Sequence, residues 1–423
     1  MKNCSKELSS RTIPIFSVIF CILFSNAFAQ VNSSVSLSGS GNKINTITTA
    51  VPFLLISPDS RAGGMGECGV ASTPDVNSMH WNAAKYAFAD KKVGVGVSYT
   101  PWLRQLVPDI NLAYLAGYGK LDKNSAIAGS LRYFSLGSIT FTDNVGTTIG
   151  TYRPNEFALD AAYARKLSPK LSGAMAVRFI YSNLTSGVTL SNGSTTHAGK
   201  TGAVDISMFY NDKKVEISGK NCELGFGLNI SNIGAKISYT DNASARSKDF
   251  IPINMKLGSS LKINMDEVNT FAIMLDFNKL LVPTPPQYEI DSNGNPVYDA
   301  NNNPVVLKGK DPHRSVTEGM FGSFNDAPGG LKEELREVII QTGMEYWYDK
   351  QFAVRFGYFH EDKLKGNRQF FTLGAGVRYN VFGLDFAYLI PTQQRNPLQN
   401  TLRFSLTFDF DAFNKQNDSS KKE

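Results

Sequence analysis

The stretch QFAVRFGYF (residues 351–359) decides the fold, because it alternates large apolar side chains with small or charged ones along its length. Successive side chains of an extended strand point to opposite faces, so Phe352 and Phe356 lie on one face and Arg355 on the other. The stretch TLRFSLTFDF (residues 401–410) repeats this pattern still more regularly. Strands of soluble sandwiches average only about five or six residues. The length of these runs therefore favours an outer-membrane barrel, whose strands have about 9–11 residues and alternate lipid-facing with interior positions.

Fourteen segments of this kind follow one another along the chain. They begin near Val93, Ile110, Ser125, Glu156, Leu171, Ala203, Glu223, Phe250, Val268, Glu337, Gln351, Gln369, Phe382 and Thr401. The segment from Glu223 changes register within ISNIG (residues 230–234), which predicts a β-bulge at Asn232 or Gly234. Single-chain bacterial barrels have an even number of strands. The sequence therefore predicts an all-β fold, a 14-stranded antiparallel outer-membrane β-barrel over residues 92–413.

The connections between these segments alternate in length. Every second connection is short, as in KLDKN (residues 120–124) and YDKQ (residues 348–351), with NDKKVEISGKN (residues 211–221) somewhat longer. Most of the others are long and rich in turn residues, and the longest spans residues 282–332. Short periplasmic turns that alternate with long extracellular loops are typical of outer-membrane barrels. We therefore expect a bacterial outer-membrane protein whose long loops face the cell exterior.

The N-terminus predicts a secretory signal peptide over residues 1–29. Basic residues precede an apolar run over residues 13–24, and AFA (residues 27–29) supplies a cleavage site before Gln30. This run is too short to cross a bilayer as a helix, which needs about 20 apolar residues. The mature chain is then expected to contain a polar extension (30–50), a non-strand segment (51–91), the barrel (92–413) and a polar tail (414–423).

The composition excludes several classes of protein. Charged residues make up 19% and hydrophobic residues 42% of the chain, which argues against both a disordered tail and a helical membrane protein. Signal-peptide removal takes away three basic residues and one acidic residue, and lowers the formal charge from +6 to about +4, too little to indicate a nucleic-acid partner. Cys68 and Cys222 then remain, which predicts two buried free thiols and leaves one bridge as the alternative.

The non-strand segment is compact and punctuated by glycines, in RAGGMGECG (residues 61–69) and PDVNSMHWNAAKYAF (residues 74–88). A 14-stranded barrel is wider than the eight-stranded kind whose side chains fill the interior, so we expect this segment to plug the lumen. Gly63, Gly64 and Gly66 would let the backbone turn tightly and approach the wall, with positive φ at Gly64 and Gly66. Polar plug residues are expected to pair with arginines of the lumen wall. The plug residues are Asp75, Asn77, Trp81 and Asn82, and the wall arginines are Arg178, Arg355, Arg378 and Arg403.

The glycine-rich stretch resembles the plug motif of the barrel family that includes bacterial long-chain fatty-acid transporters, although Asn82-Ala83-Ala84 stands where that motif has Asn-Pro-Ala. VPFLLISPDSRAGGMGE (residues 51–67), HWNAAKYAF (residues 80–88) and YTPWLRQLVPDINLAYLAGYGKLD (residues 99–122) together resemble the PorV family. That resemblance implies a shuttle barrel of the Bacteroidetes type IX secretion system. It also implies protein partners: a large outer-membrane translocon barrel, cargo with C-terminal signal domains, and a cell-surface sortase complex.

Two loops are candidates for binding these partners. TPWLRQLVPD (residues 100–109) places apolar residues in a loop at the rim, where they fit an interaction site or an ordinary aromatic anchor at the membrane surface. The long connection carries MFGSF (residues 320–324), and loops of such length are usually functional or disordered. The candidate residues are Trp102, Leu103, Leu106, Val107, Met320, Phe321 and Phe324.

The sequence gives no indication of an enzyme or a metal site, and no cofactor is expected. The four histidines are scattered without metal-ligand spacing, and no G-x-S-x-G motif is present. DSNGNPVYD and DANNNPVVL form a tandem repeat over residues 291–307, but Asn302 occupies the position where a calcium loop has Glu. We interpret the repeat as turns in a surface loop. A plugged transporter for hydrophobic small molecules, such as fatty acids, remains the alternative function.

Overall fold

The computed structural model describes residues 44–103, 107, 109–142, 146–184, 187, 195–240, 248–292, 295–301, 303–393 and 396–410. The predicted signal peptide, most of the predicted polar extension, the predicted tail and Leu106 lie outside these residues. None of the helices in this described part is long and apolar enough to cross a membrane.

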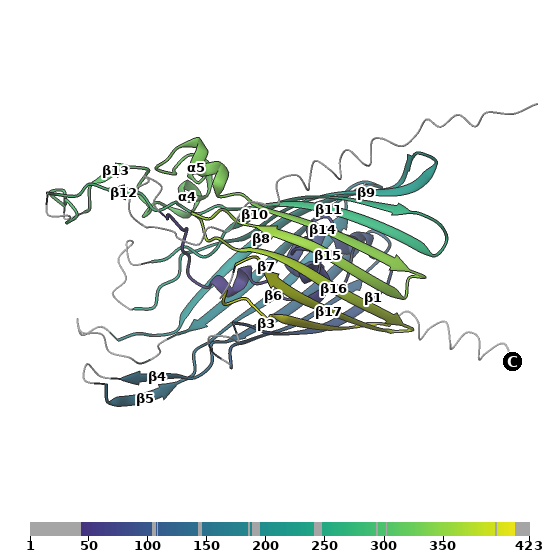
Figure 1. Cartoon of the computed structure of the whole chain (residues 1–423), viewed down its shortest axis with the longest axis horizontal. Coiled ribbons are helices and arrows are strands. Elements are labelled where there is room, and N and C mark those ends of the chain that lie inside the picture. Colours follow the sequence, from purple (N-terminus) through teal and green to yellow (C-terminus); the bar gives the residue numbers. More distant parts are fainter. Residues whose placement is uncertain are drawn as a thin grey trace, which may run out of the picture. The chain divides into compact units, whose positions relative to one another are not determined.

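Fourteen antiparallel strands close into a barrel, with β1 hydrogen-bonded to β18 (Figure 1). The strands are β1 Val93–Pro101, β2 Asn111–Lys120, β3 Ser125–Ser135, β6 Asn155–Lys166, β7 Leu171–Asn183, β8 Gly199–Ile217, β9 Lys220–Gly234, β10 Asn254–Asn264, β11 Asn269–Leu280, β14 Ile339–Tyr348, β15 Phe352–His360, β16 Gln369–Tyr379, β17 Phe382–Pro391 and β18 Leu402–Asp409. The predicted barrel is confirmed, and every predicted strand begins within four residues of an observed one.

The predicted bulge is confirmed at Asn232. Val204 pairs with Ile233 and Ile206 pairs with Ile230, so Ser231 and Asn232 of β9 lie opposite the single residue Asp205 of β8. Asn232 has φ of 62°, and its backbone N–H donates to the Asp205 carboxylate at 2.7 Å. A buried side chain of the neighbouring strand therefore fixes the position of the extra residue.

Strand β15 shows how the alternation is used. Phe352, Val354 and Phe356 are 52%, 63% and 43% exposed, whereas Ala353 and Arg355 between them are 3% and 1% exposed. Large apolar side chains therefore cover the outside of the barrel and face the surrounding solvent, which in an outer-membrane barrel is lipid. Charged residues of the same strand lie in the lumen, as the sequence predicts for Arg355.

The two ends of the barrel differ. At the short-turn end, the connections after β2, β6, β8, β10, β14 and β16 have two to four residues. The connection predicted over residues 211–221 is a two-residue turn, because β8 and β9 continue as a hairpin to Ser218 and Gly219, whose φ angles of 51° and 75° suit such a turn. At the long-loop end, the connections carry the small hairpins β4–β5 (Ile139–Thr142, Thr148–Tyr152) and β12–β13 (Gln287–Tyr288, Val306–Lys308) and the helices α4 (Val316–Gly322) and α5 (Leu331–Arg336).

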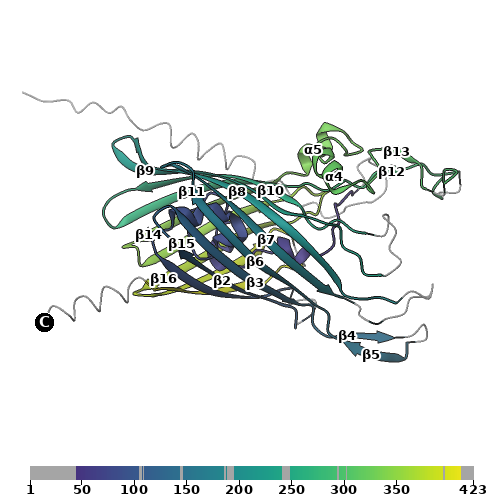
Figure 2. The ribbon, with the colours of Figure 1, turned by 180° about the vertical axis from the view of Figure 1, so that it is seen from behind.

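Residues 51–91, called here the inner segment, lie within the ring of strands (Figure 2). They form four short helical turns: η1 Pro52–Leu55, α2 Ser60–Gly63, α3 Ser78–Trp81 and η2 Ala83–Phe88. The N–H of Ala50 donates to the carbonyl of Phe250 at the long-loop end, and Lys120 donates to the carbonyl of Lys92 at the short-turn end. The segment therefore runs the length of the lumen before β1 begins.

Two apolar clusters hold the inner segment at its two ends. Near the long-loop end, Phe53 and Leu54 pack with Leu112, Ile180 and Ile253, all 3% exposed or less. Near the short-turn end, η2 packs on a wall of small side chains. These wall residues are Ala126, Ala162, Ala164, Ala174 and Ala176. Small residues at inward positions leave the space that the helical turn fills.

Candidate functional site

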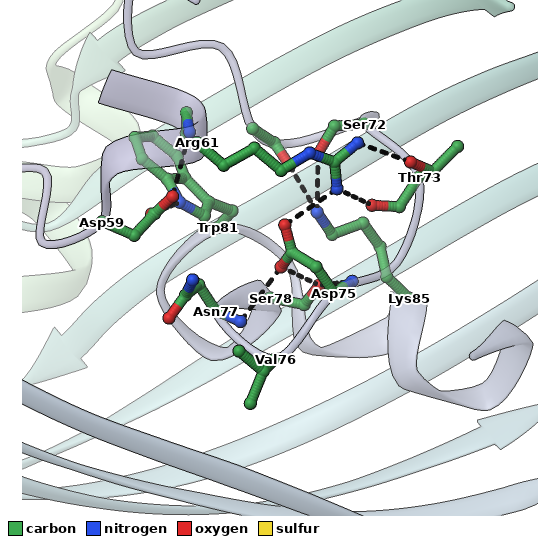
Figure 3. A network of polar contacts seen from close by, with 12 residues as sticks. Asp59, Arg61, Ser72, Thr73, Asp75, Val76, Asn77, Ser78, Trp81 and Lys85 are labelled. Carbon is green, nitrogen blue, oxygen red and sulfur yellow. Dashed lines mark hydrogen bonds and ion pairs between the residues drawn. The ribbon is translucent and has the colours of Figure 1, made fainter. Parts of the chain in front are cut away.

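The polar centre of the inner segment is Arg61 on α2 (Figure 3). All five N–H donors of its guanidinium are used. Nε and Nη2 donate to the two carboxylate oxygens of Glu345 on β14 at 2.9 and 2.8 Å. Nη1 donates to Asp75 at 2.9 Å and to the Thr73 carbonyl at 3.0 Å, and Nη2 also donates to the Thr73 hydroxyl at 2.6 Å. Arg61 thus ties the loop after α2 to the barrel wall.

The ion pairs continue along the wall from this point. Glu345 also accepts from Arg355 Nε at 2.9 Å, and Arg355 Nη1 donates to Asp385 at 2.8 Å. Asp385 accepts further from Arg378 at 2.6 Å. Arg355 and Arg378 both lie over the ring of Trp347, at 5.4 Å from its centre. We call the residues Asp75, Arg61, Glu345, Arg355, Asp385 and Arg378 the ionic chain.

The two other wall arginines make separate contacts. Arg178 on β7 donates to Asp160 and Asp205 on the neighbouring strands β6 and β8, and to Asn232 on β9 beyond β8. Arg403 on β18 donates to Glu67 of the inner segment at 2.7 Å. The expectation that Arg178, Arg355, Arg378 and Arg403 pair with Asp75, Asn77, Trp81 or Asn82 is therefore wrong. These arginines pair instead with carboxylates of the wall strands and of residues 61–67.

The predicted polar residues of the inner segment instead bond mainly within that segment. The Asp75 carboxylate accepts from Arg61 and from the Asn77 backbone, and Trp81 Nε1 donates to Asp59 at 2.7 Å. Asn82 Nδ2 donates to the carbonyls of Val70 and Met208, so among the four it alone bonds to a wall strand in the described contacts. The polar groups of these four residues therefore mainly stabilise the local fold of the inner segment.

Two of the glycines make close approaches to the wall. Gly66 has φ of 65°, as predicted, and a Cβ there would lie 2.5 Å from the Thr342 carbonyl oxygen. Gly64 has φ of −79°, so the expectation of positive φ is wrong, but a Cβ would lie 2.9 Å from the Gly374 Cα. At Gly63 a Cβ would meet the Arg403 side chain at 2.6 Å. Glycine is needed at positions 64 and 66 because backbone atoms of the wall occupy the space, whereas at Gly63 the neighbour is a side chain.

Burial perturbs the titration of three groups of the inner segment. Burial lowers the pKa of Lys85 to about 8, while its Nζ donates to the Gly69 carbonyl and the Ser72 hydroxyl (Figure 3). Burial and the negative charge of Asp75 raise the pKa of Asp59 to about 6. For Asp75, burial is outweighed by the positive charges of Arg61 and Lys85, and its pKa lies below the ordinary value. The titration of these three groups therefore depends on the buried charges that surround them in the lumen.

A cavity of about 500 Å³ lies beside the ionic chain. Its lining includes Arg61, Asp75 and Glu345, together with strand ends and turn residues of the short-turn end such as Lys262 and Lys350. The cavity is therefore bounded by the inner segment on one side and by the short-turn mouth of the barrel on the other.

At the long-loop end, Trp102 and Leu103 differ from the exposed rim that the sequence suggested. Both are half-buried and pack on an apolar cluster that includes Ile339 and Phe370, and Trp102 lies under Arg403. Val107 is also half-buried, and its N–H donates to the Leu103 carbonyl. Trp102 and Leu103 turn inward because the lumen offers an apolar surface there.

Helices α4 and α5 present exposed apolar side chains instead. Phe321 and Phe324 are 72% and 48% exposed, whereas Met320 is half-buried against the long-loop cluster. Leu331 and Leu335 of α5, which the sequence reasoning missed, are 74% and 65% exposed. The sequence did contain an indication of this apolar face, because two leucines four residues apart lie on the same face of a helix.

Among the described residues, no group of three or more His, Cys, Asp and Glu side chains is arranged to hold a metal ion. Cys68 and Cys222 are both buried and free, as predicted.

Comparison with known families decides the identity. The family model described as "Type IX secretion system protein PorV" matches residues 39–287, more than half of the chain. The chain belongs to the PorV family. It is therefore an outer-membrane component of the type IX secretion system. The matched region covers the whole inner segment and the strands β1 to β11.

Solved structures similar to this PorV-family chain include hydrocarbon-transporter barrels. The toluene transporter TodX of Pseudomonas putida is 11% identical, with 84% of this chain and 98% of that chain covered and a TM-score of 0.49. A Pseudomonas aeruginosa FadL homologue is 12% identical, with 86% and 99% covered and a TM-score of 0.42. No curated protein matches the chain.

Proposed function

We propose that this chain binds the C-terminal signal domains of cargo proteins at the translocon and delivers them to the cell-surface attachment complex. Membership of the PorV family is the observation that carries the proposal. The long loops then face the cell exterior and the short turns face the periplasm, as is usual for outer-membrane barrels. Partners would bind to the loops of this barrel, without cargo passing through its lumen.

The packing of the lumen supports binding at the loops. We propose that the inner segment is a plug, because it is joined to β14 through Arg61 and Glu345 and to β18 through Glu67 and Arg403. A backbone N–H pair at Gly69 and Val70 also donates to Asp276 on β11, at 2.8 and 3.0 Å. These anchors lie on β18 and on the neighbouring strands β14 and β11, all within one arc of the ring, and would hold the segment against that part of the wall.

The long connection between β11 and β14 supplies the candidate contact surface. Helix α5 is fixed by buried ion pairs at α5 and its C-cap, in which Lys279 meets Glu334 and Glu337, and Lys365 meets Glu333 and Glu337. Such fixed display favours recognition, because little conformational entropy is lost on binding. We assign partner contact to Phe321, Phe324, Leu331 and Leu335, and no longer to the half-buried Trp102 and Leu103.

The alternative, a transporter for hydrophobic small molecules, needs a route through the barrel. The long-loop cluster counts against such a route, because Phe53, Ile237 and Ile253 in it are fully buried. The likeness to transporter barrels concerns the fold alone.

A deletion strain tests the proposed function. Without the gene, secreted proteins should accumulate in the periplasm with uncleaved C-terminal signal domains, while fatty-acid uptake stays normal. The double variant Phe321→Ser/Leu335→Ser should restore barrel assembly but not secretion. Leu307→Ser is the matched control, because Leu307 is 60% exposed on the β12–β13 hairpin of the same loop. Normal secretion in the deletion strain together with a defect in lipid uptake would favour the transporter instead.

A further inference from the structure

The cavity at the short-turn mouth has the features of a binding site that the proposed function does not use. Its volume of about 500 Å³ falls within the range of about 300–1,000 Å³ that ligand-binding pockets occupy. Residues 72–77 of the inner segment line it, together with side chains of the ionic chain. Turn residues of the barrel form its rim. We call the part formed by the inner segment and the ionic chain the floor of the cavity, and the part formed by the turn residues its rim.

The carboxylates of the cavity floor are already neutralised. Asp75 and Glu345 both pair with Arg61, and Glu345 also pairs with Arg355. Asp385 pairs with Arg355 and Arg378. Arg61 has no donor left for a ligand, because its five N–H groups are all bonded within the protein. The floor therefore presents no net charge, and the rim decides which ligand the cavity attracts.

The rim carries more lysines than acidic residues. Lys91 and Lys350, both exposed, and the partly exposed Lys262 line the cavity together with Asp90 and Asp409. Lys262 Nζ also pairs with Glu223 at 3.4 Å, so Lys91 and Lys350 are the rim lysines best placed to meet a ligand.

Three more lysines converge beside the cavity, on the residues that lead out of the inner segment. Lys120 Nζ donates to the Ala89 carbonyl at 2.8 Å, and Lys166 Nζ lies 4.9 Å from the centre of the Phe88 ring. Lys213 Nζ pairs with Asp90 at 3.1 Å. Lysines from β2, β6 and β8 thus gather at one point of the mouth, with Asp90 as the acidic residue among these contacts.

We propose that this lysine-rimmed cavity binds an acidic polypeptide segment presented from the short-turn side of the barrel. Charge complementarity identifies the partner, because a rim of lysines attracts carboxylates over distances of about 10 Å at moderate salt. The lysines also face the right way for a polypeptide. Lys120 and Lys166 continue the inward alternation of β2 and β6 and touch the inner segment, so they point into the mouth and away from the lipid. Lipid headgroups surround the outside of a barrel and would need outward-facing lysines.

A binding experiment on the full-length protein in detergent tests this site. Fluorescein-labelled hexaglutamate is the probe, hexalysine is the control peptide, and fluorescence anisotropy is the measurement. Hexaglutamate should bind at low salt and be released as the salt rises to about 0.3 M, because screening weakens exposed charge pairs. Hexalysine should not bind. Absence of hexaglutamate binding at low salt would refute the proposal.

Charge-reversal variants locate the bound peptide. Lys91→Glu/Lys350→Glu should weaken hexaglutamate binding about tenfold or more, because two favourable charge contacts become repulsive. The matched control is Lys308→Glu/Lys310→Glu, which reverses two exposed lysines at the long-loop end and should leave affinity unchanged. Equal loss in both variants would show unspecific attraction by net charge and overturn the assignment. Heat-modifiable migration on gels confirms that each variant is folded.

A footprint on the unmodified protein gives an answer that does not depend on any variant. Hexaglutamate should protect Lys91 and Lys350 from acetylation, while Lys308 and Lys310 react at the same rate with and without peptide. Nanodiscs containing phosphatidylglycerol serve as the competing ligand. If these nanodiscs protect Lys91 and Lys350 and hexaglutamate does not, the site recognises lipid and the proposal is wrong. The loss of cargo secretion tested above is a separate readout, so the two proposals fail independently.

Discussion

Replacing Glu345 with Gln removes the charge at the junction between the inner segment and the wall while keeping the shape of the side chain. Glu345 accepts three charge-assisted hydrogen bonds, two from Arg61 and one from Arg355, at 2.8–2.9 Å. Its carboxylate is 4% exposed, so water cannot replace the lost charge. The variant therefore leaves part of two buried positive charges uncompensated.

The expected loss in the free energy of unfolding depends on which contacts the variant keeps. Three hydrogen bonds to a charged group would together be worth about 4–9 kcal/mol if all were lost. Arg61 retains Asp75, Arg355 retains Asp385, and the amide oxygen of the substituted side chain still accepts. We therefore expect a loss of about 3–5 kcal/mol in the free energy of unfolding, as for other broken buried pairs.

Urea unfolding of the detergent-solubilised protein, followed by heat-modifiable gel migration, measures this loss. Glu216→Gln is the control, because Glu216 is exposed on β8 and should cost less than about 0.5 kcal/mol. The double variant Arg61→Gln/Glu345→Gln should cost less than the sum of its single changes, because both remove the same contact. A loss below about 1 kcal/mol for Glu345→Gln, or simple additivity, would refute the role of this pair as an anchor.

Two further predictions concern the lipid face and the pH dependence of stability. Phe356→Arg should lower the free energy of unfolding by about 2–4 kcal/mol, because Phe356 lies mid-strand on β15 and is 43% exposed on the outer face; an unchanged urea midpoint would show that the lipid-facing register is wrong. Burial lowers the pKa of Lys85 to about 8, from 10.5 in the unfolded chain, so the unfolded chain binds more protons between these values and the free energy of unfolding should rise as the pH increases through this window. Lys85→Met should remove that rise, and an equal rise in both proteins would assign it to other groups.

The positions of the strands could be predicted from the sequence because each strand carries its own signal. A residue that faces lipid must be apolar, whereas the next residue faces the lumen and can be small, polar or charged. Each strand therefore shows the alternation in its own sequence. The bulge at Asn232 was visible for the same reason, as a break in the alternation. The boundary of β10 is four residues later than predicted, because Pro252 cannot donate to a ladder and Ile251 and Ile253 join the long-loop cluster.

The pairing of charges in the lumen could not be predicted in the same way. Alternation places Glu345 and Arg355 on the inward face, but which charges meet depends on the register between strands. Glu345 lies directly opposite Arg355 across β14 and β15, and this pairing leaves Arg355 to bridge to Asp385. The anchoring role of Arg61 was not predicted, because an arginine two residues before Gly63 carries no sequence pattern that identifies its partner on the wall.

The anchors of the inner segment also support the proposal that partners bind at the loops while the segment stays in place. Withdrawing the inner segment would remove Glu67 from Arg403 and the N–H groups of Gly69 and Val70 from Asp276, and would leave Glu345 with Arg355 as its remaining charged partner. Each uncompensated buried charge costs several kcal/mol, and the long-loop cluster would lose its core residues Phe53 and Leu54 as well. Such a cost is comparable with the whole stability of a typical domain, about 5–15 kcal/mol. A barrel that withdrew the segment in each cycle would need an energy source, whereas the partner contacts proposed for the exposed residues Phe321 and Leu335 require no movement of the segment.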